Sequence, residues 1–269
     1  MNAYIRYLDS NIYYQKLGNG PCVVFLHGFL ESSQIFEEII SVISKTNTCI
    51  AIDLPGHGQS QGLNESFNMN DLANLVHAIL VHEKISRASF VGHSLGAYIS
   101  FELLDAFAEL VTGICVFHSS AAADSKARKN NRNKAIRLID KDSSKFLTAF
   151  MPHLFAPKNR DLYQSEIKAL MQCSENIKIE DVVKMIEAMR DRRNYSDVLK
   201  AYNGSKLYII GKEDPILPSN ELVSQARYTR SHFIVLENVG HMGFVEDFPG
   251  TLASIMAFKD KCSADALEC

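Results

Sequence analysis

A serine between two glycines, directly after a short apolar run, most constrains the fold of this chain. The run ASFV at residues 88–91 leads into GHSLG at residues 92–96, and a helical pattern follows. Glycine has no Cβ, so it fits where the backbone passes too close to its neighbours for any other residue. Glycines two positions before and after Ser94 therefore predict a sharp strand-to-helix turn that lifts the serine hydroxyl clear of a sheet.

The rest of the chain alternates short β-rich runs with helical patterns. Several runs are continuously apolar, which is typical of strands buried on both faces. Strands that alternate with helices imply right-handed crossovers and a mainly parallel sheet. The predicted strands are residues 12–17, 22–26, 48–54, 88–91, 113–117, 206–210 and 232–236, and the helices that accompany them are residues 34–45, 69–84, 94–108, 219–227 and 249–261.

The alternation stops between residues 121 and 203, where no strand pattern is found. We expect a helical lid inserted between two strands of one sheet, not an independent domain. The predicted organisation is a core of residues 1–120 and 204–269 with a helical cap at residues 121–203. The expected cap helices are residues 126–140, 143–151, 162–173 and 180–190, with a proline-punctuated connector at residues 151–161.

A serine hydroxyl needs a base to take its proton and an acid to hold that base. In an α/β sheet enzyme these partners follow in the order serine, acid, histidine, each after a strand. Asp214 follows the strand at residues 206–210, and His241 follows the strand at residues 232–236. Because the carboxyl ends of parallel strands share one edge of the sheet, we expect these residues to meet Ser94 there.

Two other carboxyl groups compete for the place of the acid. Glu213 is adjacent to Asp214, and Asp124 follows the strand at residues 113–117. We favour Asp214, and we expect Asp124 to begin or cap the first helix of the cap.

Five motifs together resemble those of the α/β-hydrolase family. They are HGF at residues 27–29, DLPGHGQS at 53–60, GHSLG at 92–96, GKEDPILP at 211–218 and VGHMGFVEDFP at 239–249. The resemblance covers essentially the whole core, and the helical insertion falls where that family carries its cap. It implies an α/β fold with a mainly parallel eight-stranded sheet flanked by helices, and a cap inserted after strand 6.

The same resemblance implies roles for single residues. Ser94 would be the nucleophile, His241 the base and Asp214 the acid. The backbone N–H groups of Phe29 and Leu95 would form an oxyanion hole, in which one donor contributes roughly 3–4 kcal/mol to stabilising the transition state.

The other motif residues are expected to be structural. His27 is expected to be a hydrogen-bonding residue, His57 to tie down a loop and His93 to pack beside the nucleophile, while the resemblance makes Asp53 a turn residue. His118, at the end of a predicted strand, is a candidate for reaching the pocket. The histidines are not spaced as metal ligands, so we expect no metal and no cofactor.

The first predicted cap helix carries a cluster of basic residues, for which a solvated helix face is the ordinary explanation. Arg132, however, shares the apolar side of this helix with Ala135 and Ile139. Our hypothesis is that Arg132 points inward and binds a substrate carboxylate through two nitrogens. The cluster comprises Lys126, Arg128, Lys129, Arg132, Lys134 and Arg137.

A lid over an active site must present some apolar surface, so we expect a mostly apolar acyl or alcohol site. Phe150 and Met189 in the cap, and Met242 beside His241, are the candidate substrate contacts.

Composition excludes several partners. The net charge of −3 offers no basic field for nucleic acid. No run of about 18 apolar residues predicts a membrane span, and the N-terminus has no signal-peptide pattern. The six cysteines, at positions 22, 49, 115, 173, 262 and 269, form no C-x-x-C pair and suit reduced thiols. We expect a cytoplasmic monomer or homodimer that binds a small molecule.

A serine nucleophile favours acyl transfer. Epoxide hydrolases and haloalkane dehalogenases in the resembled family use aspartate at this position, so both are disfavoured. We expect a serine hydrolase that cleaves a small carboxylic ester through an acyl-enzyme. Three alternatives remain: a C–C bond hydrolase or menaquinone-pathway-like lyase on an acidic substrate, a slow-turnover small-molecule binding protein, and cofactor-free oxygenation.

Overall fold

The computed structural model describes residues 1–265. Eight strands form one sheet in the order β1-β2-β4-β3-β5-β6-β7-β8. The pairs β1–β2 and β2–β4 are antiparallel and the others are parallel, so the predicted mainly parallel sheet is confirmed. The strands are β1 (Asn2–Tyr7), β2 (Ser10–Leu17), β3 (Cys22–Leu26), β4 (Thr48–Ile52), β5 (Ala88–His93), β6 (Val111–Phe117), β7 (Ser205–Gly211) and β8 (His232–Leu236).

Strand β1 is absent from our sequence prediction. Its side chains alternate between exposed and half-buried, and none is fully buried. Asn2 and Arg6 interrupt its apolar residues, so the segment lacks the continuous apolar run that marks the central strands.

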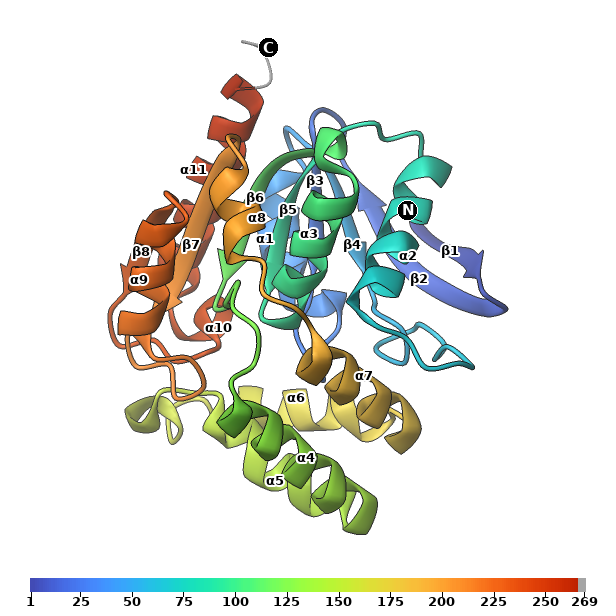
Figure 1. Ribbon diagram of the computed structural model, residues 1–269, viewed down its shortest axis with the longest axis vertical. Coiled ribbons are helices and arrows are strands. Elements are labelled where there is room, and N and C mark those ends of the chain that lie inside the picture. Colours follow the sequence, from blue (N-terminus) through green and yellow to red (C-terminus); the bar gives the residue numbers. More distant parts are fainter. Residues whose placement is uncertain (266–269) are drawn as a thin grey trace.

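Helices cover both faces of the sheet. Figure 1 shows α2, α3, α8 and α9 in front of it and α1 and α11 behind, and α11 packs against β5 to β8. The α-helices are α1 (Glu37–Ile43), α2 (Met69–His82), α3 (Leu95–Ala106), α4 (Lys126–Lys141), α5 (Ser143–His153), α6 (Gln164–Glu175), α7 (Ile179–Asp191), α8 (Ser196–Ala201), α9 (Ser219–Tyr228), α10 (Gly243–Glu246) and α11 (Phe248–Asp265). Short 3₁₀ helices are η1 (Ser33–Phe36), η2 (Ala108–Leu110) and η3 (Pro157–Asn159).

The central strands form the core. Every residue of β3, β4 and β5 is buried, as their continuous apolar runs predict. Phe25, Ile50 and Phe90 are completely shielded from solvent. Burying a side chain of this size stabilises the fold by roughly 1.5–3 kcal/mol, so these strands make a rigid base for the loops at their carboxyl ends.

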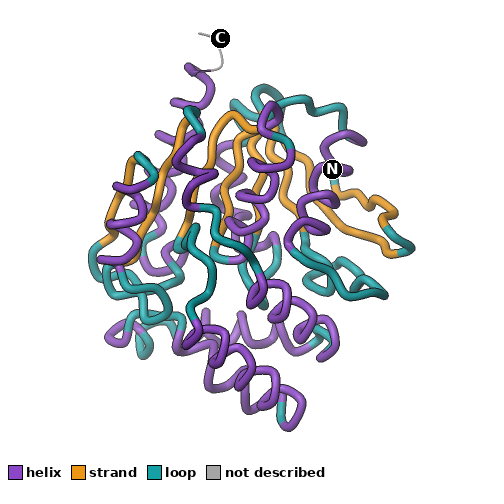
Figure 2. The backbone as a smooth tube through the Cα atoms, viewed as in Figure 1, coloured by secondary structure: helices purple, strands orange, loops and turns teal. Residues whose placement is uncertain are grey.

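Helices α4 to α7 form a separate layer beyond those carboxyl ends (Figure 1). The layer leaves the core after β6 and returns toward β7, as Figure 2 shows for the purple helices and their teal connections. Within it, α4 packs against α5 and α7, and α5 packs against α6.

Helix α8 also falls inside the segment predicted as cap, residues 121–203, but it packs against α3 and α9 of the core. We therefore propose a cap that consists of α4 to α7, and assign α8 to the core.

Candidate active site

Ser94 stands alone between β5 and α3, in a backbone conformation that few residues adopt. Its φ is +48° and its ψ is −109°, and its N–H donates to the carbonyl oxygen of Phe117 at 2.8 Å. A Cβ on Gly96 would lie 2.0 Å from the Leu26 carbonyl oxygen, and one on Gly92 would also meet backbone atoms. Both glycines are therefore required by close approach, which confirms the turn predicted from their spacing.

Three residues from distant parts of the chain form a hydrogen-bonded series. His241 Nε2 lies 3.0 Å from Ser94 Oγ, and His241 Nδ1 lies 2.7 Å from Asp214 Oδ2. The other Asp214 oxygen accepts the N–H groups of Ile216 at 2.8 Å and Leu217 at 3.0 Å. The carboxylate is thus held from behind while it accepts the Nδ1 proton, which leaves Nε2 free to accept the serine proton.

The charge around His241 favours its protonated form. Burial by itself lowers the pKa of His241, but the adjacent Asp214 carboxylate, with Glu31 and Glu246 further away, raises it above its ordinary value. The His241 ring is therefore more basic than a free imidazole, although it is buried.

The two other candidate acids, Glu213 and Asp124, bind basic side chains instead of His241. Glu213 binds Lys158 at 2.7 Å near the surface. Asp124 is bound by two arginines, Arg132 and Arg192. The expectation that Asp124 begins or caps the first cap helix is wrong, because the next residue, Ser125, is the N-cap, and its side chain accepts the N–H of the third residue of α4 at 3.3 Å.

The backbone beside Ser94 presents two free donors. Within residues 1–265 no hydrogen bond occupies the N–H of Phe29 or of Leu95. Leu95 opens the 12-residue helix α3, whose N-terminal end favours negative charge. Phe29 is half-buried and lines the same cavity as Ser94. Both N–H groups can therefore serve an oxygen that becomes negative at this point.

A buried pair of hydrogen-bonded side chains, not predicted from sequence, lies behind the site. Glu31 Oε2 accepts the Gly28 N–H at 2.6 Å and lies 2.9 Å from His93 Nδ1. His93 Nε2 lies 2.9 Å from the carbonyl oxygen of His241. Both ring nitrogens of His93 therefore face acceptors. Burial raises the pKa of Glu31, but the adjacent His93 ring and its hydrogen bond lower it overall.

This pair joins the loop of Phe29 to the loop of His241. A carboxyl side chain two residues after Phe29, at the end of the apolar run that contains β3, is the sequence signal that could have indicated it.

The loop of His241 is also fixed to the connector that follows α5. The His241 N–H donates to the Leu154 carbonyl oxygen at 2.8 Å. The Glu246 carboxylate accepts the N–H groups of Gly240 and Ala156, each at 2.9 Å. The connector after α5 therefore helps to position His241.

Two of the predicted substrate contacts do not reach the cavity. His118 is fully buried, its Nδ1 accepts the Gly211 N–H at 3.0 Å, and its Nε2 faces the backbone of Gly243. Burial, and the nearby His241 and His93, hold the pKa of His118 well below its ordinary range, so the ring is neutral. Met242 is likewise fully buried, because its side chain packs in the core.

The structural roles expected of the early motif residues are confirmed. His27 Nε2 accepts the Leu54 N–H at 2.9 Å, and burial together with His57 lowers the pKa of His27 to about 3. Asp53 accepts the N–H groups of Ser33 and Gln59, each at 2.8 Å.

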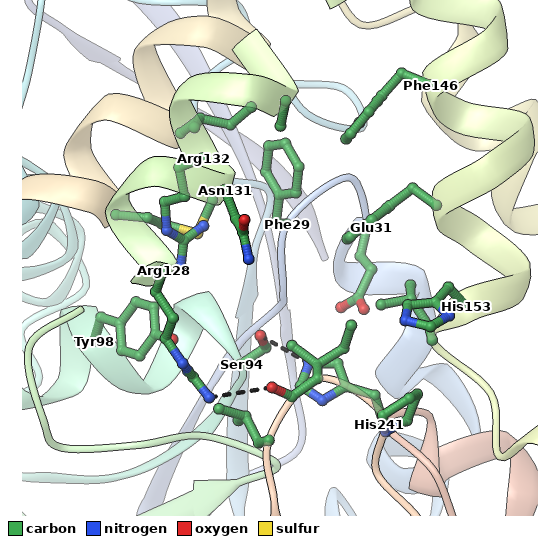
Figure 3. Close-up of a pocket in the computed structure, with 18 residues that line it drawn as sticks. Phe29, Glu31, Ser94, Tyr98, Arg128, Asn131, Arg132, Phe146, His153 and His241 are labelled. Atoms are coloured by element: carbon green, nitrogen blue, oxygen red, sulfur yellow. Dashed lines mark hydrogen bonds between the residues drawn. The ribbon is translucent and has the colours of Figure 1, made fainter. Parts of the chain in front are cut away.

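Above Ser94 lies a cavity of about 390 Å³ between the core and the cap (Figure 3). Its walls are mainly apolar, and Phe150 stacks edge-on against Phe29 with ring centres 6.1 Å apart. Of the predicted cap contacts, Arg132, Phe150 and Met189 all line this cavity. Arg128, which the sequence did not single out from the basic cluster, lines it as well.

Residues 1–265 contain no group of three histidine, cysteine or acidic side chains placed to hold a metal ion. The same residues contain no helix that is long and apolar enough to cross a membrane. Cys22, Cys49, Cys115 and Cys262 are buried free thiols, and Cys269 lies outside the described residues.

Comparison with known proteins identifies similar chains. A family model described as alpha/beta hydrolase fold matches residues 21–196. The uncharacterized hydrolase YugF of Bacillus subtilis (strain 168) is 34% identical over 113 residues, which are 41% of this chain and 41% of that protein. The 2-(acetamidomethylene)succinate hydrolase of Mesorhizobium japonicum is 32% identical over 100 residues, 37% of this chain and 36% of that protein. The chain thus matches less than half the length of these two relatives.

Among solved structures, a thermophilic esterase from Thermogutta terrifontis with malate bound is similar over nearly its whole length. The TM-score is 0.89 at 22% identity, and the alignment covers 97% of this chain and 99% of the esterase. At this identity the likeness concerns the fold alone.

Proposed function

The chain belongs to the α/β-hydrolase family, and we propose that it is a serine hydrolase that cleaves an acyl bond of a small carboxylic ester. The observation that carries this proposal is the series from Ser94 through His241 to Asp214, with contacts of 3.0 and 2.7 Å. Its members follow one another in the order that this fold requires, and the serine stands on a strained turn beside two free N–H donors.

In the first step, the Ser94 Oγ forms a bond to the substrate carbonyl carbon as its proton moves to His241 Nε2. The electron pair of the carbonyl moves onto its oxygen, and the N–H groups of Phe29 and Leu95 stabilise that negative charge. Asp214, 2.7 Å from Nδ1, stabilises the imidazolium that forms.

The tetrahedral species then loses its alcohol. The bond between the carbonyl carbon and the leaving oxygen breaks, His241 gives its proton to that oxygen, and the acyl group stays on Ser94. A water molecule next gives a proton to His241 as its oxygen bonds to the acyl carbon. When the bond to Ser94 breaks, the serine regains the proton and the acid is released, so one water is consumed.

A second candidate is a C–C bond hydrolase, or a lyase, that acts on an acidic substrate. The observation that favours it is the pair of guanidinium groups, Arg128 and Arg132, in the wall of the cavity. The same three residues would act in both reactions, so the substrate alone separates the two candidates.

The first experiment treats the purified protein with a fluorophosphonate probe and locates the adduct by mass spectrometry. We expect a single adduct on Ser94, lost in Ser94→Ala and in His241→Ala. Ser165→Ala, which removes an exposed hydroxyl on α6, serves as the matched control and retains labelling. Simple carboxylic esters are then compared by kcat/KM.

A folded protein that the probe does not label would contradict the proposal. If that protein also showed a large rise in Tm with small carboxylic esters and no turnover, the slow-turnover binding protein would be the better description.

A further inference from the structure

We propose that the substrate of this site carries a carboxylate group, and that Arg128, with Arg132 beside it on α4, binds that group. This inference rests on the proposed function and specifies its substrate class. It starts from the distribution of charge around the cavity above Ser94, where the cap contributes two guanidinium groups that lack a full complement of carboxylates.

The guanidinium group of Arg132 shares its carboxylate partner with a second arginine. Arg132 Nε donates to the Asp124 carboxylate, and Arg192 Nη1 donates to the same carboxylate at 2.7 Å. The Arg192 guanidinium is buried and also stacks on the Tyr98 ring, 3.9 Å from the ring centre, so two contacts fix its position beside Asp124. One carboxylate therefore serves two guanidinium groups, and a net positive charge remains beside Arg132.

The second group has no acidic partner within residues 1–265. The recorded contact of the Arg128 guanidinium is a hydrogen bond from Nη2 to the carbonyl oxygen of Ile216, at 3.1 Å. Ile216 lies in the loop of Asp214, so Arg128 reaches from the cap toward the triad, as the dashed line in Figure 3 shows. Arginine carries five N–H donors in a planar fork, and most of them stay available to a carboxylate.

The carboxylate that lines the cavity does not neutralise these groups. Glu31 is occupied by His93 and by the N–H of Gly28. His153 is the histidine that the cap contributes to the wall of the cavity. It contacts Arg160, which adds a positive charge to the cap side of the cavity. The unpaired charge at this cavity is thus positive and belongs to the cap.

The size of the cavity agrees with a small acidic ester. About 390 Å³ lies at the lower end of the range for small-molecule sites, roughly 300–1,000 Å³. Arg128 is half-buried at the wall of this cavity, so a substrate carboxylate could be bound by two of its nitrogens without displacing a protein partner carboxylate.

The test uses two pairs of esters in which a carboxylate is replaced by an acetyl group of similar size. Monoethyl succinate and ethyl levulinate differ on the acyl side. 4-Acetoxybutanoate and 5-acetoxypentan-2-one differ on the alcohol side. We expect the anionic member of at least one pair to be preferred, and Arg128→Gln to lower its kcat/KM by roughly 10- to 100-fold. The neutral member should change less than about twofold, within the error of such comparisons.

Arg137→Gln, which removes an exposed arginine of the same helix, is the matched control and should leave both members unchanged. Arg128→Lys retains the charge without the planar fork and should lose less activity than Arg128→Gln. The Tm of each variant is measured first, so that a folding defect is recognised.

The outcomes separate the two proposals. An equal loss for both members of each pair would make Arg128 a tie between cap and loop through Ile216, and would overturn the inference. Labelling of Ser94 without any anionic preference would do the same, while the hydrolase proposal stands. If Ser94 is not labelled, the proposed function fails, and calorimetry with succinate decides: binding that requires Arg128 supports the inference, and its absence overturns it.

Discussion

Replacing Asp214 by asparagine should disable the site while preserving its shape. Asp214 Oδ1 accepts two N–H groups, from the half-buried Ile216 and the buried Leu217, and Oδ2 faces His241 Nδ1 at 2.7 Å. An asparagine that keeps its oxygen toward the two N–H groups must place its amide NH₂ against Nδ1. The proton of His241 then moves to Nε2, which can no longer accept the proton of Ser94.

The opposite orientation of the asparagine is disfavoured by the same geometry. It would leave both N–H groups, one half-buried and one buried, without acceptors, at about 1–3 kcal/mol each, or about 2–6 kcal/mol together. A tautomer disfavoured by that much is depleted by roughly 30-fold to 10⁴-fold, at about 1.4 kcal/mol per factor of ten. The variant also loses the charge that stabilises the imidazolium of His241. We therefore expect kcat/KM to fall by about 10³- to 10⁴-fold.

The assay is steady-state ester hydrolysis, with unfolding in urea to show that the variant folds. Glu213→Gln is the control, because this adjacent carboxylate binds Lys158 instead. A loss of less than about tenfold in Asp214→Asn, or an equal loss in Glu213→Gln, would refute the assignment of the acid.

Three further results are expected. The kcat/KM should decline as pH falls, with a midpoint above 6.5, because neighbouring carboxylates raise the pKa of His241 and only the neutral ring accepts a proton; a midpoint below 6.5 would contradict this. Gly96→Ala should lower the free energy of unfolding in urea by at least about 1–3 kcal/mol, since its Cβ would lie 2.0 Å from a carbonyl oxygen of β3, and an unchanged midpoint would argue against that contact. Glu31→Ala should destabilise in the same assay by about 1–3 kcal/mol for each of the two buried groups, the Gly28 N–H and His93 Nδ1, that lose their acceptor, whereas exposed Glu38→Ala should stay within about 0.5 kcal/mol; equal effects would disprove these hydrogen bonds.

Local sequence patterns predicted most of the fold. The apolar runs of β3 and β8 were predicted with their observed bounds, and α2 and α9 within two residues. These elements carry their signal in a few consecutive residues. Strand β1, in contrast, is interrupted by Arg6 and begins with Asn2, so its segment shows no continuous apolar run to detect.

The residues of the site were likewise predicted in part from local sequence and in part only from the tertiary structure. The sequence by itself determined that Ser94 stands on a strained turn, because the two glycines that permit the turn are its near neighbours, and it placed an acid and a histidine after later strands. Only the tertiary structure showed that Asp214, and not Glu213 or Asp124, faces His241, since that contact joins residues 27 positions apart and the next joins residues 147 positions apart.

Which charged side chains contact one another was the feature least predictable from the sequence. The hypothesis that Arg132 faces the cavity followed from helical spacing. Its bond to Asp124 did not, and neither did the lack of such a partner for Arg128 in the described part of the chain. The bond between Glu31 and His93 joins residues 62 positions apart. A pattern along the chain shows which residues can carry a charge, and the packing of distant elements decides which charges meet, which are neutralised, and which remain for a substrate.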